Sequence, residues 1–269
     1  MQAASKNARI RIVQSRQNTR VKELRSALRK GEKTDSGLAA LEGLHLVEEA
    51  IRSGLRIVTI FVRSDSLPLL DRFRIPGQTE ILELPGEVFA SAVTTESPQG
   101  IAALAEVPAF TLEKILAVPH LLLIVSAGLQ DPGNLGTIVR SAEAFGADGL
   151  IALPGTVSIW NSKALRASAG SAFRLPVIPT ISKELFPALR SHGIRALATT
   201  VDGGTPAGQL DLSQPIALFI GNEGNGLSSD LISQCDDRIT IPCPGPVESL
   251  NAAIAASILL YEASRQRQT

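Results

Sequence analysis

A glycine-rich turn near the C-terminus carries the residue types whose chemistry is easiest to recognise. The apolar run Leu218–Ile220 leads directly into "GNEGNGLS" at positions 221–228. A Walker phosphate loop requires a lysine where Leu227 stands, and the dinucleotide fingerprint fails because Glu223 occupies its middle glycine position. A turn with a carboxylate suits a cationic, neutral or hydroxyl-rich group, such as a nucleoside joined to a sulfonium. The alternative is a purely structural turn that needs positive φ at a glycine.

A second segment, "DPGNLGTIVRSAEAF" at 131–145, is typical of a turn that opens a helix. Apolar residues at helical spacing predict its buried stripe: Leu135, Ile138, Val139, Ala142 and Phe145. Asn134 and Arg140 fall elsewhere on its surface. An arginine there can hold a phosphate or a ribose edge, or it is an ordinary surface arginine.

The third segment is "IPCPGPVESLNAAIAASILLY" at 241–261. Its prolines and glycine predict an irregular loop, with Ser249 and Asn251 at the opening of a helix. That helix is apolar nearly all round from Leu250 to Leu260, which indicates burial on more than one side. We expect it to contact its own sheet and a second subunit.

The remaining reactive residues indicate no other chemistry. His45, His120 and His192 are scattered, and no cysteine–histidine spacing suggests zinc, so no metal is expected. Cys235 and Cys243 fit a reducing compartment and are interpreted as small buried side chains.

The elements that position these segments alternate along the second part of the chain. Strands are predicted at 121–126, 149–153, 175–179, 196–200, 216–221 and 238–242, and helices at 134–145, 162–169, 183–191 and 248–265. Continuous apolar strands separated by helices predict an α/β fold with a mostly parallel sheet covered on both faces.

The first part of the chain predicts a smaller α/β module. Helices are expected at 15–31, where Gly31 ends the first, and at 41–52, with strands at 57–63 and 101–107. The domain prediction is therefore a small module at 1–108, a linker at 109–118, and a larger domain at 119–269.

Composition fits a globular protein and shows one marked asymmetry of charge. Of 269 residues, 44% are hydrophobic and 19% charged, and no apolar run is long enough for a membrane helix. Without a signal-peptide core, the cytoplasm is the expected location. The net charge is zero, yet residues 1–33 hold ten basic and two acidic residues. With little acidic interleaving, this basic arm predicts an RNA contact through Arg16, Arg20, Lys22, Arg25, Arg29 and Lys30.

Together the three C-terminal segments resemble the three motifs of the SpoU (TrmH-type) family of ribose methyltransferases, in the SPOUT superfamily. "NSKALRASAGSAFRLPV" at 161–177 is similar to the family as well. The first module resembles the RNA substrate-binding domain of many members, through "LEGLHLVEEAIRSG" and "TTESPQGIAAL". The likeness covers nearly the whole chain.

The resemblance implies transfer of a methyl group from S-adenosylmethionine to a ribose 2′-hydroxyl, by a SPOUT domain that contains a trefoil knot. It implies cofactor binding by Thr199, Thr200, Gly221, Ile241 and Leu250. The implied catalytic positions are Arg140, Asn134, Glu223, Ser249 and Asn251. Since a lone arginine stays protonated, Arg140 is expected to orient a phosphate and lower the pKa of the hydroxyl.

The expected partners are RNA and a second copy of the chain, because the family works as a homodimer. Ribosomal RNA of the 23S type is favoured over transfer RNA, and the nucleotide is not specified by the sequence. An inactive RNA-binding SPOUT protein, a methyltransferase acting on a base nitrogen and a nucleotide hydrolase are the alternatives. The hydrolase is disfavoured by the missing Walker lysine.

Overall fold

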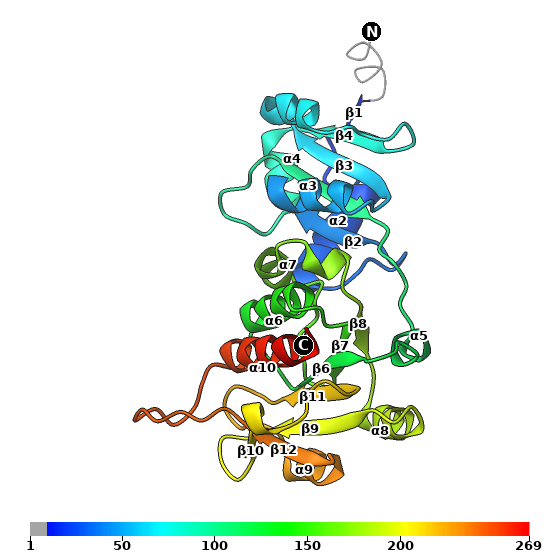
Figure 1. Cartoon of the computed structure of the whole chain (residues 1–269). Helices are drawn as coiled ribbons and strands as arrows, with labels where there is room; N and C mark the ends of the chain where they lie inside the picture. The colour runs from blue at the N-terminus through cyan, green and yellow to red at the C-terminus, as the bar shows by residue number, and fades with distance from the viewer. Residues whose placement is uncertain (1–9, 269) are drawn as a thin grey trace. The chain divides into compact units, whose positions relative to one another are not determined.

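The structure, a computed structural model, describes residues 10–268, which divide into two compact units (Figure 1). The first comprises the chain up to Pro108 together with Trp160–Phe173, and the second comprises Ala109–Ile159 and the chain from Arg174 onward. The predicted domains were continuous stretches of chain. In the structure, Trp160–Phe173 belongs to the first unit, although it lies within the second predicted domain. Close packing explains this: a Cβ on Gly31 would lie 3.1 Å from Asn161 Nδ2, and one on Gly170 would lie 2.9 Å from Glu49 Cβ.

The first unit is built on a five-stranded mixed sheet in the order β1-β4-β3-β5-β2. Its strands are β1 (Ile10–Ile12), β2 (Ala39–Glu42), β3 (Ile57–Arg63), β4 (Glu80–Leu84) and β5 (Ile101–Ala105). Its helices are α2 (Thr19–Lys30), α3 (Leu44–Arg52), η1 (Ser64–Arg72), α4 (Gly86–Ala92), α7 (Ser162–Ser168) and η2 (Ser171–Phe173). One core joins the buried faces of α2 and α4 to the sheet through Leu24, Leu28, Phe61, Leu82 and Phe89.

The end of α2 follows the prediction, whereas α2 begins at Thr19 rather than at 15 and α3 also begins later than predicted. Asn18 caps α2 by accepting from the backbone of Arg20 and Val21, and Gly31 ends it in the left-handed region at φ 67°. The helix predicted at 41–52 begins later, because Leu41 and Glu42 complete β2 and Gly43, at φ 100°, separates strand from helix.

The second unit confirms the predicted α/β fold. Its seven strands run parallel in the order β10-β12-β9-β11-β6-β7-β8. They are β6 (Leu122–Ala127), β7 (Gly149–Leu153), β8 (Val177–Pro179), β9 (Arg195–Thr199), β10 (Thr205–Pro206), β11 (Ile216–Ile220) and β12 (Asp237–Thr240). The helices are α5 (Leu112–Leu116), α6 (Pro132–Ala144), α8 (Ser182–Ser191), η3 (Ala207–Gln209), α9 (Ser229–Gln234) and α10 (Ala252–Arg267).

Helices cover both faces of this sheet because successive strand side chains point in opposite directions. One face packs against α5, α8 and α9, where the Phe186 and Phe219 rings stack 5.2 Å apart. The other face is covered by α6 and α10, which lie against each other and share a 2.7 Å hydrogen bond between the Ser141 and Ser257 hydroxyls (Figure 1).

The predicted linker at 109–118 contains α5, whose Ile115 and Leu116 are buried in the core of the second unit. This stretch therefore contributes to packing rather than serving as bare chain. Within residues 10–268, no helix is long and apolar enough to cross a bilayer.

Candidate functional site

Three neighbouring parallel strands end at the same edge of the large sheet. β9 ends at Thr199, β11 at Ile220 and β12 at Thr240, and they lie side by side in the order β12-β9-β11. Parallel strands bring their carboxyl ends together, and ligands of open α/β sheets bind at such an edge. The predicted glycine turn and the predicted irregular loop follow β11 and β12 directly.

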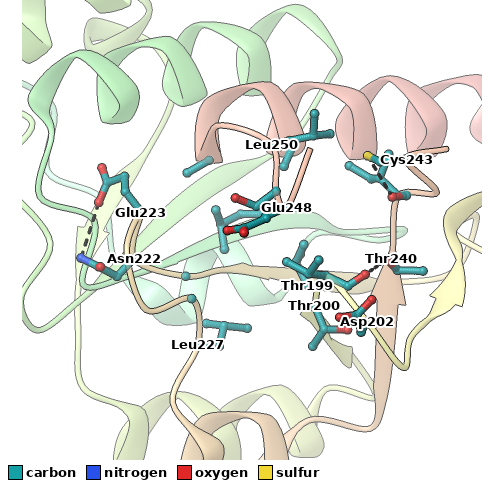
Figure 2. Close-up of a pocket in the computed structure, with 18 of the residues that line it drawn as sticks. Thr199, Thr200, Asp202, Asn222, Glu223, Leu227, Thr240, Cys243, Glu248 and Leu250 are labelled. Carbon is teal, nitrogen blue, oxygen red and sulfur yellow. Dashed lines mark hydrogen bonds between the residues drawn. The ribbon is translucent and has the colours of Figure 1, made fainter. Parts of the chain in front are cut away.

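A cavity of about 1010 Å³ lies at this edge (Figure 2). Its walls come from the segments after β9 and β11 and from the loop at 241–251. All five predicted cofactor positions line it: Thr199, Thr200, Gly221, Ile241 and Leu250. The volume is at the upper end of the range typical of small-molecule pockets, so a nucleoside joined to an amino acid can enter.

Gly221 is required at the cavity wall by the close approach of backbone. A Cβ at this position would lie 2.2 Å from the carbonyl carbon of Gly226 and 2.4 Å from Leu227 N. The turn closes on itself here, since Asn222 and Gly226 exchange two backbone hydrogen bonds.

Asn222 holds the turn in place, although it was not among the predicted site residues. Its Oδ1 accepts from Gly224 N at 2.9 Å and Asn225 N at 3.2 Å, while its Nδ2 donates to Gly128 O at 2.8 Å. An asparagine that accepts from the backbone two residues further on is an Asx turn, so "NEGNG" carried the signal.

Side chains from the three motifs meet in one chain of hydrogen bonds. Asn251 Nδ2 donates to Asn134 Oδ1 at 3.1 Å, and Asn134 Nδ2 donates to Glu223 Oε1 at 3.0 Å. Glu223 also accepts from Gln130 N and Asp131 N. Asn251 additionally caps α10 by accepting from the amides of Ala253 and Ile254. The starts of α6 and α10 are thereby fixed to the glycine turn.

These bonds determine the ionisation of Glu223. Burial, the largest single influence, raises the pKa of its carboxyl. The hydrogen bonds from Asn134, from its own backbone and from the amides of Asp131 and Gln130 outweigh burial, so the pKa lies below its usual value. Glu223 is an anionic anchor for the network rather than a proton donor at neutral pH.

The other two predicted catalytic residues lie apart from this network. Ser249 is exposed on the cavity wall in the loop before α10, since that helix begins at Ala252 and not at 248 as expected. Arg140 is exposed on α6 and does not line the cavity. Its guanidinium has no hydrogen-bond or ion-pair partner within residues 10–268.

The cavity lining is acidic and contains unsatisfied polar groups. Asp202, Glu223 and Glu248 line it, whereas none of the described lining residues is lysine, arginine or histidine. Figure 2 shows the Glu248 side chain directed into the cavity. The hydroxyl oxygens of Thr199 and Thr200 are buried without a partner in the part of the chain that the structure describes. The acidic lining suits a cationic ligand.

Two arginines of the basic N-terminal stretch pair with carboxylates in the structure. Arg16 pairs with Glu87 of α4 at 3.2 Å, and Arg20 lies 3.7 Å from Glu80 of β4. Arg20 also pairs with Glu23 at 2.8 Å.

The other four predicted RNA contacts divide into one occupied and three available side chains. Arg25 donates to Ser91 O at 2.8 Å and to Ser91 Oγ at 3.0 Å. Lys22, Arg29 and Lys30 are exposed, and their side chains have no partner among residues 10–268. Lys6 and Arg9 lie outside the described residues.

The cysteines and possible metal ligands add little to the site. Burial raises the pKa of the half-buried Cys235 thiol to about 12. Cys243 is exposed at the cavity, so its interpretation as a buried side chain is wrong. Residues 10–268 hold no group of three His, Cys, Asp or Glu placed to bind a metal ion.

Comparison with known proteins agrees with this arrangement over both units. Residues 121–261 match the SpoU rRNA Methylase family, and residues 18–103 match the MRM3-like substrate binding domain. The chain is 35% identical over 253 residues to the "23S rRNA (guanosine(2553)-2'-O)-methyltransferase RlmP" of Bacillus subtilis, covering 93% of this chain and 97% of that protein.

Two similar solved structures hold the same cofactor. One is the SpoU methyltransferase AviRb of Streptomyces viridochromogenes in complex with AdoMet, with a TM-score of 0.81, 30% identity and coverage of 94% and 99% of the two chains. The other is an AdoMet-bound rRNA methyltransferase of Sinorhizobium meliloti, with a TM-score of 0.82, 29% identity and coverage of 96% and 98%. This chain is therefore a member of the SpoU rRNA methylase family.

Proposed function

We propose that the protein transfers the methyl group of S-adenosylmethionine to a ribose 2′-hydroxyl of ribosomal RNA. The observation that carries the proposal is the acidic cavity lined by the second and third family motifs, to which the first motif is joined by the hydrogen bond between Asn134 and Glu223. The chain is similar along nearly its whole length to a 23S rRNA 2′-O-methyltransferase, which favours ribosomal RNA over transfer RNA.

The residues of the cavity fit this cofactor. S-adenosylmethionine, when bound, supplies an electrophilic methyl group on a positively charged sulfonium. Thr199 and Thr200 line the cavity beside the ligand, and Asp202 and Glu248 supply negative charge. Gly221, Ile241 and Leu250 present backbone to the ligand without a charged side chain.

Arg140 is the residue that contacts the RNA substrate in this proposal. Its guanidinium is exposed, unpaired among residues 10–268 and outside the cavity lining, which suits a contact with RNA rather than with the cofactor. A guanidinium stays protonated and holds phosphate in a two-pronged geometry. Arg140 orients the ribose-phosphate and lowers the pKa of the attacking hydroxyl, while Asn134, Glu223 and Asn251 keep the starts of α6 and α10 in place. Ser249 contributes a hydroxyl at the cavity wall.

The RNA itself is held in part by the first unit. Lys22, Arg29 and Lys30 carry available positive charge on α2, which gives a salt-sensitive contact with phosphates. DNA lacks the 2′-hydroxyl that receives the methyl group, so it is not a substrate. A ribosomal substrate locates the activity in the cytoplasm.

The protein functions as a homodimer in this proposal. Ile254, Ile258 and Tyr261 are 50%, 39% and 55% exposed and repeat at helical spacing on α10, opposite its buried Ala256, Leu259 and Ala263. An apolar stripe of this kind is stabilised when another protein surface covers it. A second copy of α10 is the partner that the family resemblance implies.

The trefoil knot belongs to the same proposal. The chain leaves β11, crosses to β12 on the far side of β9, and then returns to α10, which packs on α6. This path carries the loop at 241–251 across the cavity edge, and threading there would complete the knot.

Two measurements test the activity. Titration calorimetry should detect uptake of S-adenosylmethionine, and digestion with mass spectrometry should detect 2′-O-methylated nucleosides in transcribed 23S rRNA after reaction. Failure of the folded protein to take up the cofactor, even with RNA present, would end the proposal. Methylation of tRNA alone, or of a base nitrogen, would redirect it to another substrate.

Arg140→Ala should lower methylation by at least about a hundredfold, because a group acting on the reacting hydroxyl is removed. Cofactor affinity should stay nearly unchanged, since Arg140 does not line the cavity. Arg140→Lys keeps the charge but not the two-pronged contact, and should recover only part of the rate. Unchanged turnover of Arg140→Ala would remove this residue from the mechanism.

A further inference from the structure

A second cavity, of about 380 Å³, lies within the first unit and has no part in the proposed chemistry. Residues from three segments that resemble the family contribute to it, although these segments are far apart in the sequence. "LEGLHL" contributes Glu42 and His45, "TTESPQG" contributes Ser97 and Gln99, and the segment Trp160–Phe173 contributes Arg166.

Hydrogen bonds accepted by Glu42 and Gln99 hold the walls of this cavity in place. The Glu42 carboxylate accepts from Thr94 N at 3.1 Å, Thr94 Oγ1 at 2.8 Å and Thr95 N at 3.0 Å, which fixes the loop before β5. Gln99 Oε1 accepts from Leu44 N at 2.8 Å, at the start of α3, where Gly43 offers no capping side chain. The negative charge of Glu42 is thus used internally, and the loop is held in position before any ligand arrives.

Two side chains at this cavity have hydrogen-bond donors without acceptors among the described residues. Because Leu44 N–H can only donate, the Gln99 amide must turn its oxygen toward it, and its NH₂ group has no acceptor within residues 10–268. The exposed Arg166 guanidinium likewise has no partner in the described part of the chain.

Arg166 differs in this respect from most arginines of the first unit. Arg16, Arg20, Arg52, Arg56, Arg63 and Arg72 all pair with carboxylates. An unpaired guanidinium beside an unused amide donor and the exposed His45 ring makes a site for a group rich in acceptors and negative charge.

We propose that this cavity receives one nucleotide of the RNA substrate. Arg166 pairs with its phosphate, the Gln99 amide donates to an acceptor on the base or sugar, and His45 offers a flat ring against the base. The proposal rests on RNA being the substrate and names the contact by which the first unit selects it. Three segments that are distant in sequence would therefore bind the same nucleotide.

Filter binding of transcribed 23S rRNA at several salt concentrations tests this contact. Arg166→Ala should weaken binding about tenfold and reduce the salt slope by about one, as expected for the loss of one phosphate contact. Arg74→Ala is the matched control, because Arg74 is exposed and unpaired in the same unit but does not line the cavity. Calorimetric affinity for S-adenosylmethionine should not change in either variant.

Gln99→Glu provides a second test that does not depend on Arg166. The new carboxylate keeps the acceptor for Leu44 N, so the melting temperature should be preserved, while the lost donor and the added charge should weaken RNA binding. In methylation assays with 23S rRNA, both variants should raise KM for RNA and leave kcat unchanged.

Equal RNA binding by Arg166→Ala and Arg74→Ala would overturn the nucleotide site. Loss of binding only to assembled ribosomal subunits, with free RNA bound normally, would overturn it in favour of a protein partner. Failure of the proposed activity is separately visible, since it would appear in the unaltered protein as absent cofactor uptake or methylation.

Discussion

The Glu223 carboxylate collects hydrogen bonds that a neutral side chain could not all receive. An ionised carboxylate only accepts, and its partners Gln130 N, Asp131 N and Asn134 Nδ2 all donate. An amide or a protonated acid at this position would turn one donor toward another. The connection between the glycine turn and α6 therefore depends on negative charge at one residue.

Glu223→Gln should lower the melting temperature at pH 7. The lowered pKa of Glu223 means that its stabilisation is present above the usual value of 4.5 and is lost as pH falls through the folded-state value. The difference in melting temperature between the unaltered protein and the variant should therefore shrink below about pH 4. A difference that stays constant from pH 7 to pH 3 would contradict this role. Glu248→Gln serves as the control, since Glu248 has no hydrogen-bond partner within residues 10–268.

Glu248→Gln should instead change which ligand the cavity prefers. S-adenosylmethionine carries a sulfonium charge that its demethylated product, S-adenosylhomocysteine, lacks, and Glu248 points into an acidic cavity. The variant should bind S-adenosylmethionine about three- to tenfold more weakly, because one attractive charge is removed in a partly exposed site. Calorimetry with the neutral product is the internal control, and an equal loss for both ligands would argue against an electrostatic role.

Among individual residues, the uncharged residues that line the cavity were predicted better than the carboxylates that line it. Thr199, Gly221 and Leu250 were predictable because the family resemblance implies them. Asp202 and Glu248 were missed, since nothing in the local sequence says that two carboxylates from different loops line one cavity. The ion pairs of Arg16 and Arg20 were not predicted for the same reason, because their partners Glu87 and Glu80 are distant in the chain.

Among the elements, the turn after β11 tolerates the least change. Gly221→Ala introduces a Cβ 2.2 Å from Gly226 C, and backbone cannot move away as a flexible side chain can. Overpacking of this kind should cost about 1–3 kcal/mol in the free energy of unfolding and weaken cofactor binding at the cavity wall.

Gly224→Ala tests whether the loss in the free energy of unfolding is specific to position 221. Its Cβ would lie 3.5 Å from Asn222 Oδ1, an ordinary contact in the same turn. Chemical denaturation of the two variants should separate them clearly. Equal stability would mean that the turn opens easily at Gly221.

Elements with a strong period or a clear cap were predicted well. Residues 57–63 form β3 as expected, and α2 ends at Gly31 as predicted. The start of α10 was placed too early, because Ser249 and Asn251 both resemble caps and only the contact with Asn134 favours Asn251. β4, α4 and α9 were not predicted, since short segments leave a weak local signal.

For the whole molecule, the exposed stripe on α10 gives a direct test of assembly. Ile258→Glu should shift the protein from dimer to monomer in light scattering at micromolar concentration, because a charge would be buried at the interface. Ile181→Glu is the matched control, since Ile181 is also an exposed isoleucine of the second unit but lies before α8, away from the stripe. A monomeric unaltered protein would contradict the proposed homodimer.

The overall architecture was predictable and the chain's path through it was not. Continuous apolar strands such as 216–220 require burial on both faces, which is enough to predict a parallel sheet. The placement of β12 beside β9 rather than β11 depends on contacts that no local pattern encodes. The same limit applies to Trp160–Phe173, because the local sequence pattern of a short helix is the same whichever unit the helix packs against.

That segment also affects how such a protein can evolve. The first unit is assembled from two stretches of chain, and Gly31 and Gly170 are packed against residues contributed by the other stretch. A single recombination at residue 108 would therefore bring in a foreign sheet while retaining the old α7. Inheritance of the two stretches as a matched pair would be favoured, so RNA preference in such proteins should change by point substitution more readily than by domain exchange.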